Sequence, residues 1–290
     1  MLSRIFRTVI SIVLCFTIVV SCATVFNAAE NSEEIKNVDI VFCIDTTGNS
    51  VNVIDSIKST LKDILNNLDM TNRDCRFAFI QYRDFTQKTS SFDFSFEVKD
   101  FSSDLDEINN YIDSITLSYY SNEKNCLFSS LIDGHKELSF REDSVKAYIV
   151  MGQSECYDPE PFTGYDFTDI INEFNMSVNG ITSICKYKFF TINFGTNANV
   201  EKYYKYFSDY SGGKYYSVSS EDESFKNSFS AILKEILNEV FDNLEYAPDD
   251  TKISIGEVVD NILSSTPEFL KELLEPVVRI IVMLILFFNI

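Results

Sequence analysis

The feature that most constrains the fold is an alternation between short apolar segments and longer segments with helical periodicity. Helical spacing of apolar residues marks residues 51–68, 127–138 and 225–241. The apolar segments between or beside them are residues 38–44, 77–82, 146–151 and 188–194. Strands that are apolar on both faces and alternate with helices form a parallel sheet covered by helices on each side. The sequence therefore predicts an α/β fold with a doubly wound, mostly parallel sheet and helices on both faces.

One further segment has a different pattern. Phe92, Phe94, Phe96 and Val98 alternate with polar residues, which is typical of a strand with one face in water. We expect one antiparallel strand at the edge of the sheet here. The next helix is predicted to begin with Ser103 or Asp104 as its cap. Its expected inward residues are Leu105, Ile108, Ile112 and Ile115.

In doubly wound sheets, ligands bind at the carboxyl ends of the strands, where the strand order reverses. The residues that follow Ile44, Tyr82 and Met151 are therefore the candidates for a site. The segment Asp45-Thr46-Thr47-Gly48-Asn49 directly follows the first predicted strand.

This segment resembles the D-x-[ST]-x-S metal-ion-dependent adhesion site of von Willebrand factor A (vWA) domains, particularly the subset that reads D-T-T-G-S-M. Three other segments are similar to landmarks of that family and occur in the family order. They are residues 79–84 (FIQYRD), residues 101–104 (FSSD) before a helix, and residues 211–216 (SGGKYY) before the last helix. The resemblance covers roughly residues 37–245 and implies a vWA, Rossmann-like domain there.

The resemblance also implies a site for Mg2+ or another divalent cation, which prefers oxygen ligands. The candidate ligands are Asp45, Thr47, Asn49, Asn125 and Gln153. The last three depart from the family pattern, which has Ser at the first of these positions, Thr or Asp at the second, and Thr-Asp where Gly152-Gln153 stands. Glu155 or Asp158 could supply the missing charge. Either the site binds a cation weakly, or it is degenerate and Asp45 caps the following helix.

The chain has five cysteines after residue 23, an odd number, so at least one thiol is expected to stay free. Cys126 and Cys156 lie in predicted loops on the crevice side, and either a disulfide between them or two free thiols fits the sequence. Cys43 lies inside a predicted strand and is expected in the core. His135 is the only histidine and lies in the middle of a predicted helix, so the sequence offers no convincing Ser/His/Asp set.

The amino terminus has the pattern of an export signal. Arg4 and Arg7 precede an apolar stretch at residues 9–20, which is short for a transmembrane helix. Cleavage after Ala23 would give a signal peptide of residues 1–23. Alternatively, Val19-Val20-Ser21-Cys22 is a lipobox, with a signal ending at residue 21 and a lipidated Cys22. An uncleaved anchor is a third alternative, and all three place the domain outside the cytoplasm, secreted or on the cell surface.

The predicted C-terminal extension, residues 246–290, ends in an apolar tail at residues 277–290. These 14 residues contain Arg279 and are too few to span a bilayer comfortably. A membrane-dipping anchor, a self-associating tail, a sorting signal and a last helix packed on the domain all fit, and we favour membrane contact.

The formal net charge of -20 disfavours a nucleic-acid partner. A phosphohydrolase of the D-x-D-x-T type would need a second Asp where Thr47 stands, and no G-x-G-x-x-G follows the first strand, so an enzyme is not expected. The favoured hypothesis is a surface-associated vWA module that binds a protein or a surface polymer. The alternative is a vWA scaffold without a metal in a membrane-associated assembly.

Overall fold

The structure is a computed structural model that describes residues 36–70, 73–85, 95–118, 124–176, 185–222 and 224–243. The chain divides into two compact units, Met1–Tyr246 and Ala247–Ile290, and all described residues belong to the first. The predicted export signal, Cys22 and the apolar tail at 277–290 therefore lie outside the described residues. Within the described ranges, no helix has the length and apolar character needed to cross a membrane.

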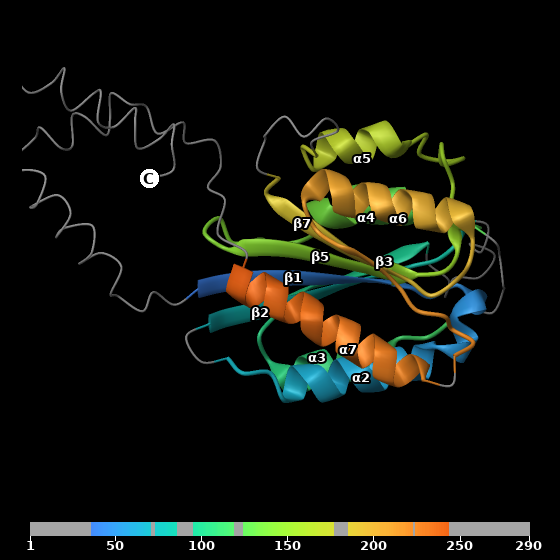
Figure 1. Cartoon of the computed structure of the whole chain (residues 1–290). Helices are drawn as coiled ribbons and strands as arrows, with labels where there is room; N and C mark the ends of the chain where they lie inside the picture. Colours follow the sequence, from blue (N-terminus) through green and yellow to red (C-terminus); the bar gives the residue numbers. More distant parts are fainter. Residues whose placement is uncertain are drawn as a thin grey trace, which may run out of the picture. The chain divides into compact units, whose positions relative to one another are not determined.

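The domain is built on a six-stranded sheet with the order β3-β2-β1-β5-β7-β8 (Figure 1). The strands are β1 (Lys36–Asp45), β2 (Arg73–Tyr82), β3 (Phe96–Ser102), β5 (Val145–Gly152), β7 (Tyr187–Asn193) and β8 (Tyr215–Ser217). All neighbouring pairs in this sheet are parallel except β2 and β3, which are antiparallel. Because β3 is the edge strand, the structure confirms the predicted fold class, including the antiparallel edge.

Helices cover both faces of the sheet, as predicted. On one face lie α2 (Ile54–Asn66), α3 (Leu105–Ser114) and α7 (Phe225–Asn238); on the other lie α4 (Leu127–Lys136), α5 (Phe167–Glu173) and α6 (Ala198–Ser211) (Figure 1). Alternate residues of β1 supply the two cores. Phe42 packs with the first helical layer, whereas Val41 and Cys43 pack with the second.

Several elements differ from the prediction. The helix predicted at residues 51–68 begins as a short 3-10 turn, η1 (Gly48–Asn52), and only then becomes α2. Leu105 was expected to face inward, but it is 37% exposed. The side chain of Asp104 accepts hydrogen bonds from the N–H groups of Asp106 and Glu107, so Leu105 lies in the capped first turn. Phe92 and Phe94 of the predicted edge strand lie outside the described residues.

The sequence analysis did not identify four elements. These are α5, α6, the strand β8 and a small second sheet, in which β4 (Lys124–Asn125) pairs in parallel with β6 (Glu155–Cys156). The small sheet connects the loop before α4 to the loop after β5.

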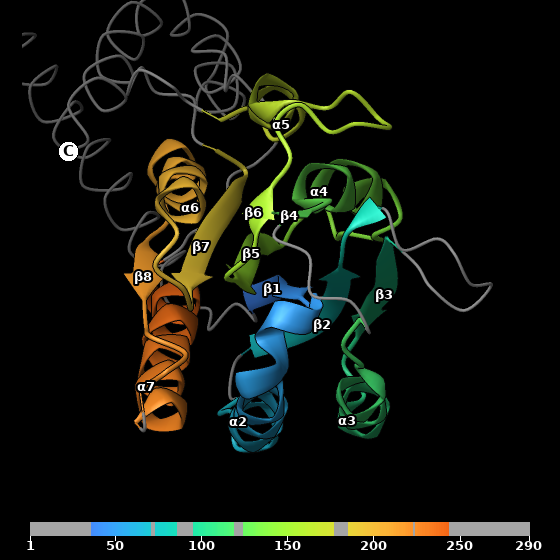
Figure 2. The same cartoon turned by 90° about the vertical axis from the view of Figure 1, so that its right-hand side faces the viewer.

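Two edges of the sheet differ in what they present. We call the edge where the parallel strands begin the amino edge and the edge where they end the carboxyl edge; Figure 2 looks onto the carboxyl edge. The first and last described segments meet at the amino edge. Lys36 Nζ donates to the Phe241 carbonyl oxygen at 3.0 Å, and Arg73 Nη2 lies 2.7 Å from Asp242 Oδ1. The chain therefore enters and leaves the sheet domain at one corner of the amino edge.

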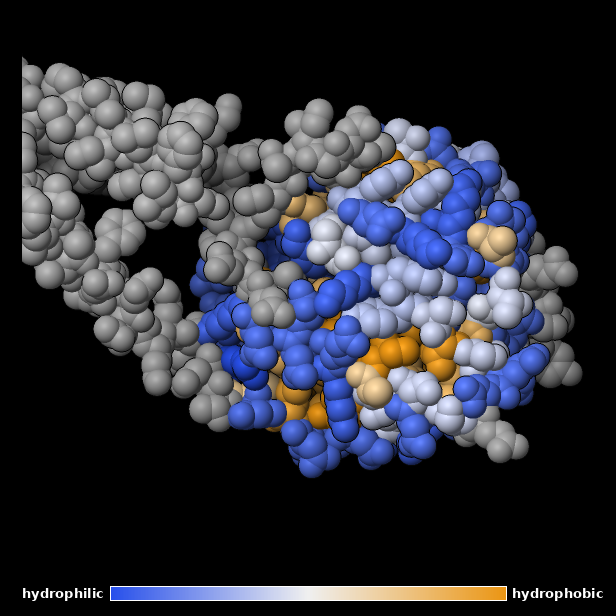
Figure 3. All heavy atoms as spheres, viewed as in Figure 1, coloured by the Kyte–Doolittle hydropathy of each residue, from blue (hydrophilic) through white to orange (hydrophobic). Residues whose placement is uncertain are grey.

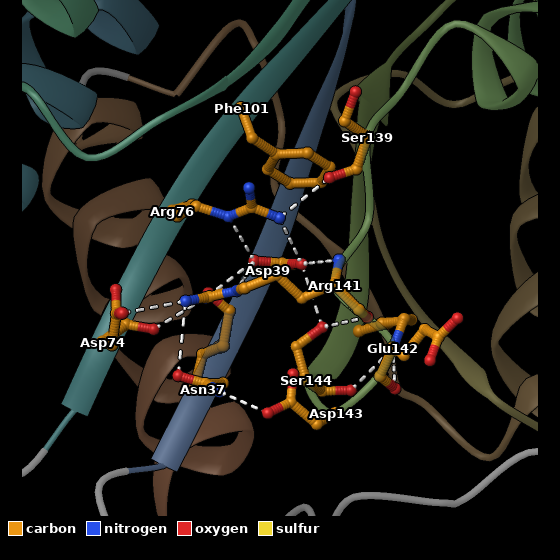
Figure 4. Close-up of polar contacts among 12 residues, drawn as sticks. Asn37, Asp39, Asp74, Arg76, Phe101, Ser139, Arg141, Glu142, Asp143 and Ser144 are labelled. Carbon is orange, nitrogen blue, oxygen red and sulfur yellow. Dashed lines mark hydrogen bonds and ion pairs between the residues drawn. The ribbon is translucent and has the colours of Figure 1, made fainter.

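A buried ion cluster also lies near the amino edge, around the fully buried Asp39 of β1 (Figure 4). Arg76 donates to Asp39 through Nε at 3.0 Å and Nη2 at 2.9 Å. Arg141 donates through its backbone N–H at 2.8 Å and through Nε at 3.0 Å, and Ser144 Oγ donates at 2.9 Å. Burial raises the pKa of Asp39, but the hydrogen bonds from Arg76 and Arg141 outweigh it and hold that pKa below its usual range.

Candidate functional site

The candidate site begins with Asp45, the last residue of β1, which is 1% exposed. Its carboxylate accepts hydrogen bonds from three backbone N–H groups. Oδ1 accepts from Thr47 at 2.9 Å, and Oδ2 accepts from Gln153 at 3.3 Å and Ser154 at 3.0 Å. Asp45 therefore joins the turn after β1 to the loop after β5, which is the point where the strand order reverses.

Gly152, the last residue of β5, makes this approach possible. A Cβ atom at residue 152 would lie 2.5 Å from Asp45 Cβ, 2.9 Å from Asp45 Oδ2 and 2.9 Å from the Tyr204 hydroxyl. The Asp45 carboxylate thus occupies the space that any side chain at this position would need. A threonine at position 152, as in the Thr-Asp of the family pattern, would not fit unless Asp45 moved.

Ser154 connects the remaining parts of the site. Its Oγ lies 2.7 Å from Thr47 Oγ1, and its carbonyl oxygen accepts from Asn125 Nδ2 at 3.0 Å. Asn125 Oδ1 in turn accepts from the N–H of Leu127 at 3.2 Å, at the start of α4. The three loops that follow β1, precede α4 and follow β5 are thereby held together.

Gln153 closes the site toward η1. Its side-chain Nε2 donates to the carbonyl oxygen of Asn49. The residue that stands in the place of the family's Asp therefore directs an N–H donor, and not an anionic oxygen, at the turn after β1.

The segment after β2 supports the same turn from the other side. Arg83, which is buried, donates through Nε to Thr46 Oγ1 at 3.2 Å and through Nη2 to Thr116 Oγ1 at 3.2 Å. The Ser118 N–H donates to the Thr46 carbonyl oxygen at 2.8 Å. The Arg of the Y-R-D segment therefore positions the Asp45 turn.

The structure brings the predicted site residues together, because Asp45, Thr47, Asn49, Asn125 and Gln153 are linked by this one network. The sequence analysis missed Ser154, which forms hydrogen bonds with Asp45, Thr47 and Asn125. Its position directly after Gly152-Gln153 was the available signal. Glu155 pairs with Lys124 at 3.1 Å, and Asp158 accepts from the hydroxyl of Tyr203, so these two carboxylates have other partners.

Of the two alternatives for Cys126 and Cys156, the structure shows the free thiols, both buried, and no disulfide between them. Cys126 Sγ donates instead to the carbonyl oxygen of Ser95 at 3.0 Å. Burial raises the pKa of both thiols, which keeps them protonated and poorly reactive. Cys43 is a fully buried core residue, as expected.

His135 lies in α4 among aromatic side chains and away from the Asp45 network. Its Nδ1 lies 2.7 Å from the hydroxyl of Tyr148. Burial, together with the charges of Lys186 and Lys136, lowers the pKa of His135 to about 4. The imidazole is therefore neutral near pH 7, and its contact with Tyr148 is part of the packing under α4.

The residues of the site do not fit a divalent cation well. Asp45 is their only carboxylate, and both of its oxygens already accept N–H groups. The hydroxyl of Thr47 is paired with Ser154, both amide atoms of Asn125 are engaged, and Gln153 directs its Nε2 at the Asn49 carbonyl oxygen. Across the described residues, no group of three or more His, Cys, Asp or Glu side chains is arranged to hold a metal ion.

Comparison with known proteins agrees with this fold. The family model of the von Willebrand factor type A domain matches residues 39–231, which is more than half of the chain. The chain belongs to the vWA family. No curated protein matches the chain significantly.

Two solved structures of other proteins are similar to this vWA domain. A conserved hypothetical protein, BatB from Bacteroides thetaiotaomicron, is 12% identical, with a TM-score of 0.45, over 69% of this chain and 99% of its own. Proximal thread matrix protein 1 from the mussel byssus is 12% identical, with a TM-score of 0.46, over 71% of this chain and 46% of its own. The family assignment comes from the match over residues 39–231 and not from these likenesses.

Proposed function

We propose that this vWA protein is an exported, surface-associated binding module that contacts a protein or a surface polymer through its carboxyl edge. vWA domains are commonly interaction modules and typically not enzymes. The observation that carries the proposal is the convergence of three loops on Asp45 at the point where the strand order reverses. Sheets of this kind bind their ligands at that point.

The most exposed large apolar side chains of the described residues support a contact surface at this edge. Val51, in η1 directly after the Asp45 turn, is 62% exposed, and Phe162 is 72% exposed. The ring of Phe162 packs edge-on against Phe85, 5.3 Å between centroids, and Phe85 follows the end of β2. Both residues thus lie at the carboxyl edge. The side of the domain seen in Figure 3, which carries α6 and α7, is mostly polar, and its apolar side chains gather mainly around α7.

The position of the chain ends supports surface attachment. The described segments that lead to both flanks of the chain meet at the amino edge, at Lys36 and Phe241. Each flank that carries a candidate anchor, Cys22 on one side and the apolar tail at 277–290 on the other, is therefore connected to the domain through that edge. The ten residues of β1 separate the two edges by about 30 Å. The carboxyl edge is thus the part of the domain that lies far from these two connections.

The burial of Asp45 favours binding over catalysis. A nucleophilic carboxylate or a general base must reach its substrate. Asp45 is 1% exposed, and its two oxygens accept three N–H groups. This geometry is that of a structural carboxylate.

A photo-crosslinking experiment on cells of the native host tests the contact surface. A photoreactive amino acid at Val51 or at Phe162 is expected to give a discrete cross-linked product on irradiation. The matched control is Met70, which is 37% exposed and accepts a hydrogen bond from the N–H of Arg73 at the amino edge. Products from Met70 alone, or from none of the three positions, would contradict the proposal.

Attachment is tested by fractionating cells that express the full chain with and without Cys22→Ser. Release of the variant from the membrane fraction would support a lipid anchor. Retention of the variant, followed by release when residues 277–290 are deleted, would support the tail. A full chain found in the cytoplasm would contradict export.

A further inference from the structure

We infer that the carboxyl edge of this vWA domain works without a divalent cation, because a closed set of hydrogen bonds takes the place of the metal. We call this set the Asp45 latch. It consists of the Asp45 carboxylate and the backbone N–H groups of Thr47, Gln153 and Ser154. The latch holds the loop after β1 against the loop after β5, and it does so with donors that belong to the chain.

The first argument is that the latch uses the anionic oxygens that a cation would need. Hydrogen bonds from backbone N–H groups to a carboxylate are among the stronger ones in proteins. The carboxylate has about four acceptor positions and three are filled, so a cation bound to it has one position left unless it displaces a donor and leaves a buried N–H group without an acceptor. Leaving such a donor unsatisfied costs free energy, which opposes cation binding.

The second argument is charge. Asp45 is the only carboxylate of the network, and Gln153 points a side-chain N–H donor at the carbonyl oxygen of Asn49. A hard divalent cation is normally bound through carboxylates or other oxygens. An N–H donor repels a cation, so the change from the family's Asp to Gln153 both removes a charge and adds a repulsive group.

The third argument is access. Thr47 and Asn125 are fully buried, and Ser154 is 4% exposed. Mg2+ usually keeps several of its waters when it binds to a protein. The packed Thr47 and Ser154 hydroxyls, 2.7 Å apart, leave no path for a hydrated ion to these oxygens without opening the loops.

The inference deepens the proposed function, since it concerns the same edge, and it rests on that function only for its biological meaning. It implies that the partner need not supply a carboxylate to complete a metal's coordination. Metal titration of the full chain needs no partner. Its outcome can therefore contradict the latch without affecting the binding role, and a failed cross-link would leave the latch unaffected.

The first experiment compares the thermal midpoint and calorimetric titration of the full chain in EDTA with those in millimolar MgCl2 or MnCl2. We expect no saturable heat and a Tm change below about 1 °C, because a ligand that binds only the folded state raises Tm. A saturable heat that Thr47→Ala abolishes would overturn the inference.

The double variant Asn49→Ser, Gln153→Asp restores the family residues at these two positions and is expected to gain a saturable heat with Mn2+. If it gains none, these two positions do not exclude the cation, and that part of the inference is wrong.

The second experiment asks whether Asp45 stabilises the domain in the absence of any cation. In EDTA, Asp45→Asn is expected to lower Tm by about 5 °C, since an asparagine cannot accept all three N–H groups. The matched control is Asp104→Asn, because Asp104 also accepts two backbone N–H groups but is exposed, and asparagine caps helices equally well. A latch predicts a loss for Asp45→Asn only. An unchanged Tm for Asp45→Asn would contradict the latch, because an empty metal site loses nothing when its carboxylate is removed.

Discussion

The two ends of β1 hold their buried carboxylates in different ways. Asp39 and Asp45 lie six residues apart on the same face of the strand, and each is almost completely buried. Asp39 is neutralised by the guanidinium groups of Arg76 and Arg141, whereas the acceptors of Asp45 are filled by backbone N–H groups. The amino edge thus uses full charges, and the carboxyl edge uses peptide dipoles.

The helices give the two edges opposite backbone polarity as well. Helices that connect parallel strands run back along the sheet, so their carbonyl ends reach the amino edge and their N–H ends reach the carboxyl edge. Cations complement the carbonyl ends: Lys188 Nζ donates to the Ser211 carbonyl oxygen of α6 at 2.9 Å. Carboxylates complement the N–H ends: Glu160 Oε1 accepts from the N–H of Ser129 in α4 at 3.0 Å. A buried Asp thus stabilises the fold at both edges. At the amino edge its partners are arginine side chains, and at the carboxyl edge they are backbone N–H groups.

The largest expected effect is at the amino edge. Asp39→Asn removes the charge that compensates two partly buried arginines, and it is expected to destabilise the domain by about 3 to 5 kcal/mol. Chemical denaturation of the full chain measures this change. Asp74→Asn is the control, since Asp74 is more than half exposed in its ion pair with Arg141, and a loss below about 1 kcal/mol is expected. Equal losses in the two variants would show that the buried cluster is not special.

The next effect is at the carboxyl edge. Gly152→Ala places a Cβ atom 2.5 Å from Asp45 Cβ and is expected to destabilise the domain by up to about 3 kcal/mol. Gly134→Ala in α4 is the control. Its Cβ would meet the movable end of Ile80 at 3.1 Å, and alanine favours the helix, so a change within about 1 kcal/mol is expected. A tolerated Gly152→Ala would mean that Asp45 can leave its position cheaply.

A smaller effect concerns pH. The pKa of folded His135 is lowered to about 4 from an ordinary value of 6.5, so the unfolded chain binds a proton first as the pH falls. The stability from this group is complete above about pH 6.5 and is lost between that value and about pH 4, by about 1 to 2 kcal/mol after allowance for partial exposure. Denaturation curves of the wild type and His135→Gln across this range should converge toward low pH. Parallel pH profiles would contradict the assignment.

The smallest expected effect is the coupling between the two carboxylates. Six residues of β1 separate Asp39 from Asp45 by about 20 Å, and distant sites add to within about 0.5 kcal/mol. The double variant with both residues changed to Asn should therefore lose the sum of the two single losses. A larger interaction energy would show that the two edges are energetically linked through β1.

The fold could be predicted because its signals are local and repeated. The apolar segments around Phe42, Phe79 and Ile149 indicated buried strands, and the landmarks of the vWA family follow one another along the chain as they do in the family. The elements that the sequence analysis missed have weak local signals. The helix α6 carries five aromatic and several charged residues that obscure its periodicity, and β8 has only three residues.

The candidate site could be located but not described from the sequence. The turn at Asp45 was found because the motif is contiguous. Two of the three partners of its carboxylate, the backbone N–H groups of Gln153 and Ser154, belong to residues more than one hundred positions away, and a backbone donor has no side-chain signature. The Asp39 cluster was missed for a related reason. Arg76 and Arg141 are distant from Asp39 in the sequence, and they reach it only once the strands have assembled into the sheet.

The corner where Lys36, Arg73, Phe241 and Asp242 meet has a mechanical consequence. The guanidinium of Arg73 also lies 4.9 Å from the centre of the Phe241 ring, so an ion pair, a cation–π contact and a lysine–carbonyl bond lie between the two points where the chain leaves the domain. Tension applied to both flanks would load this corner before the hydrogen bonds of the central strands. The corner would open one contact after another and release the end of α7 first, while the loops around Asp45 at the far edge carried no load.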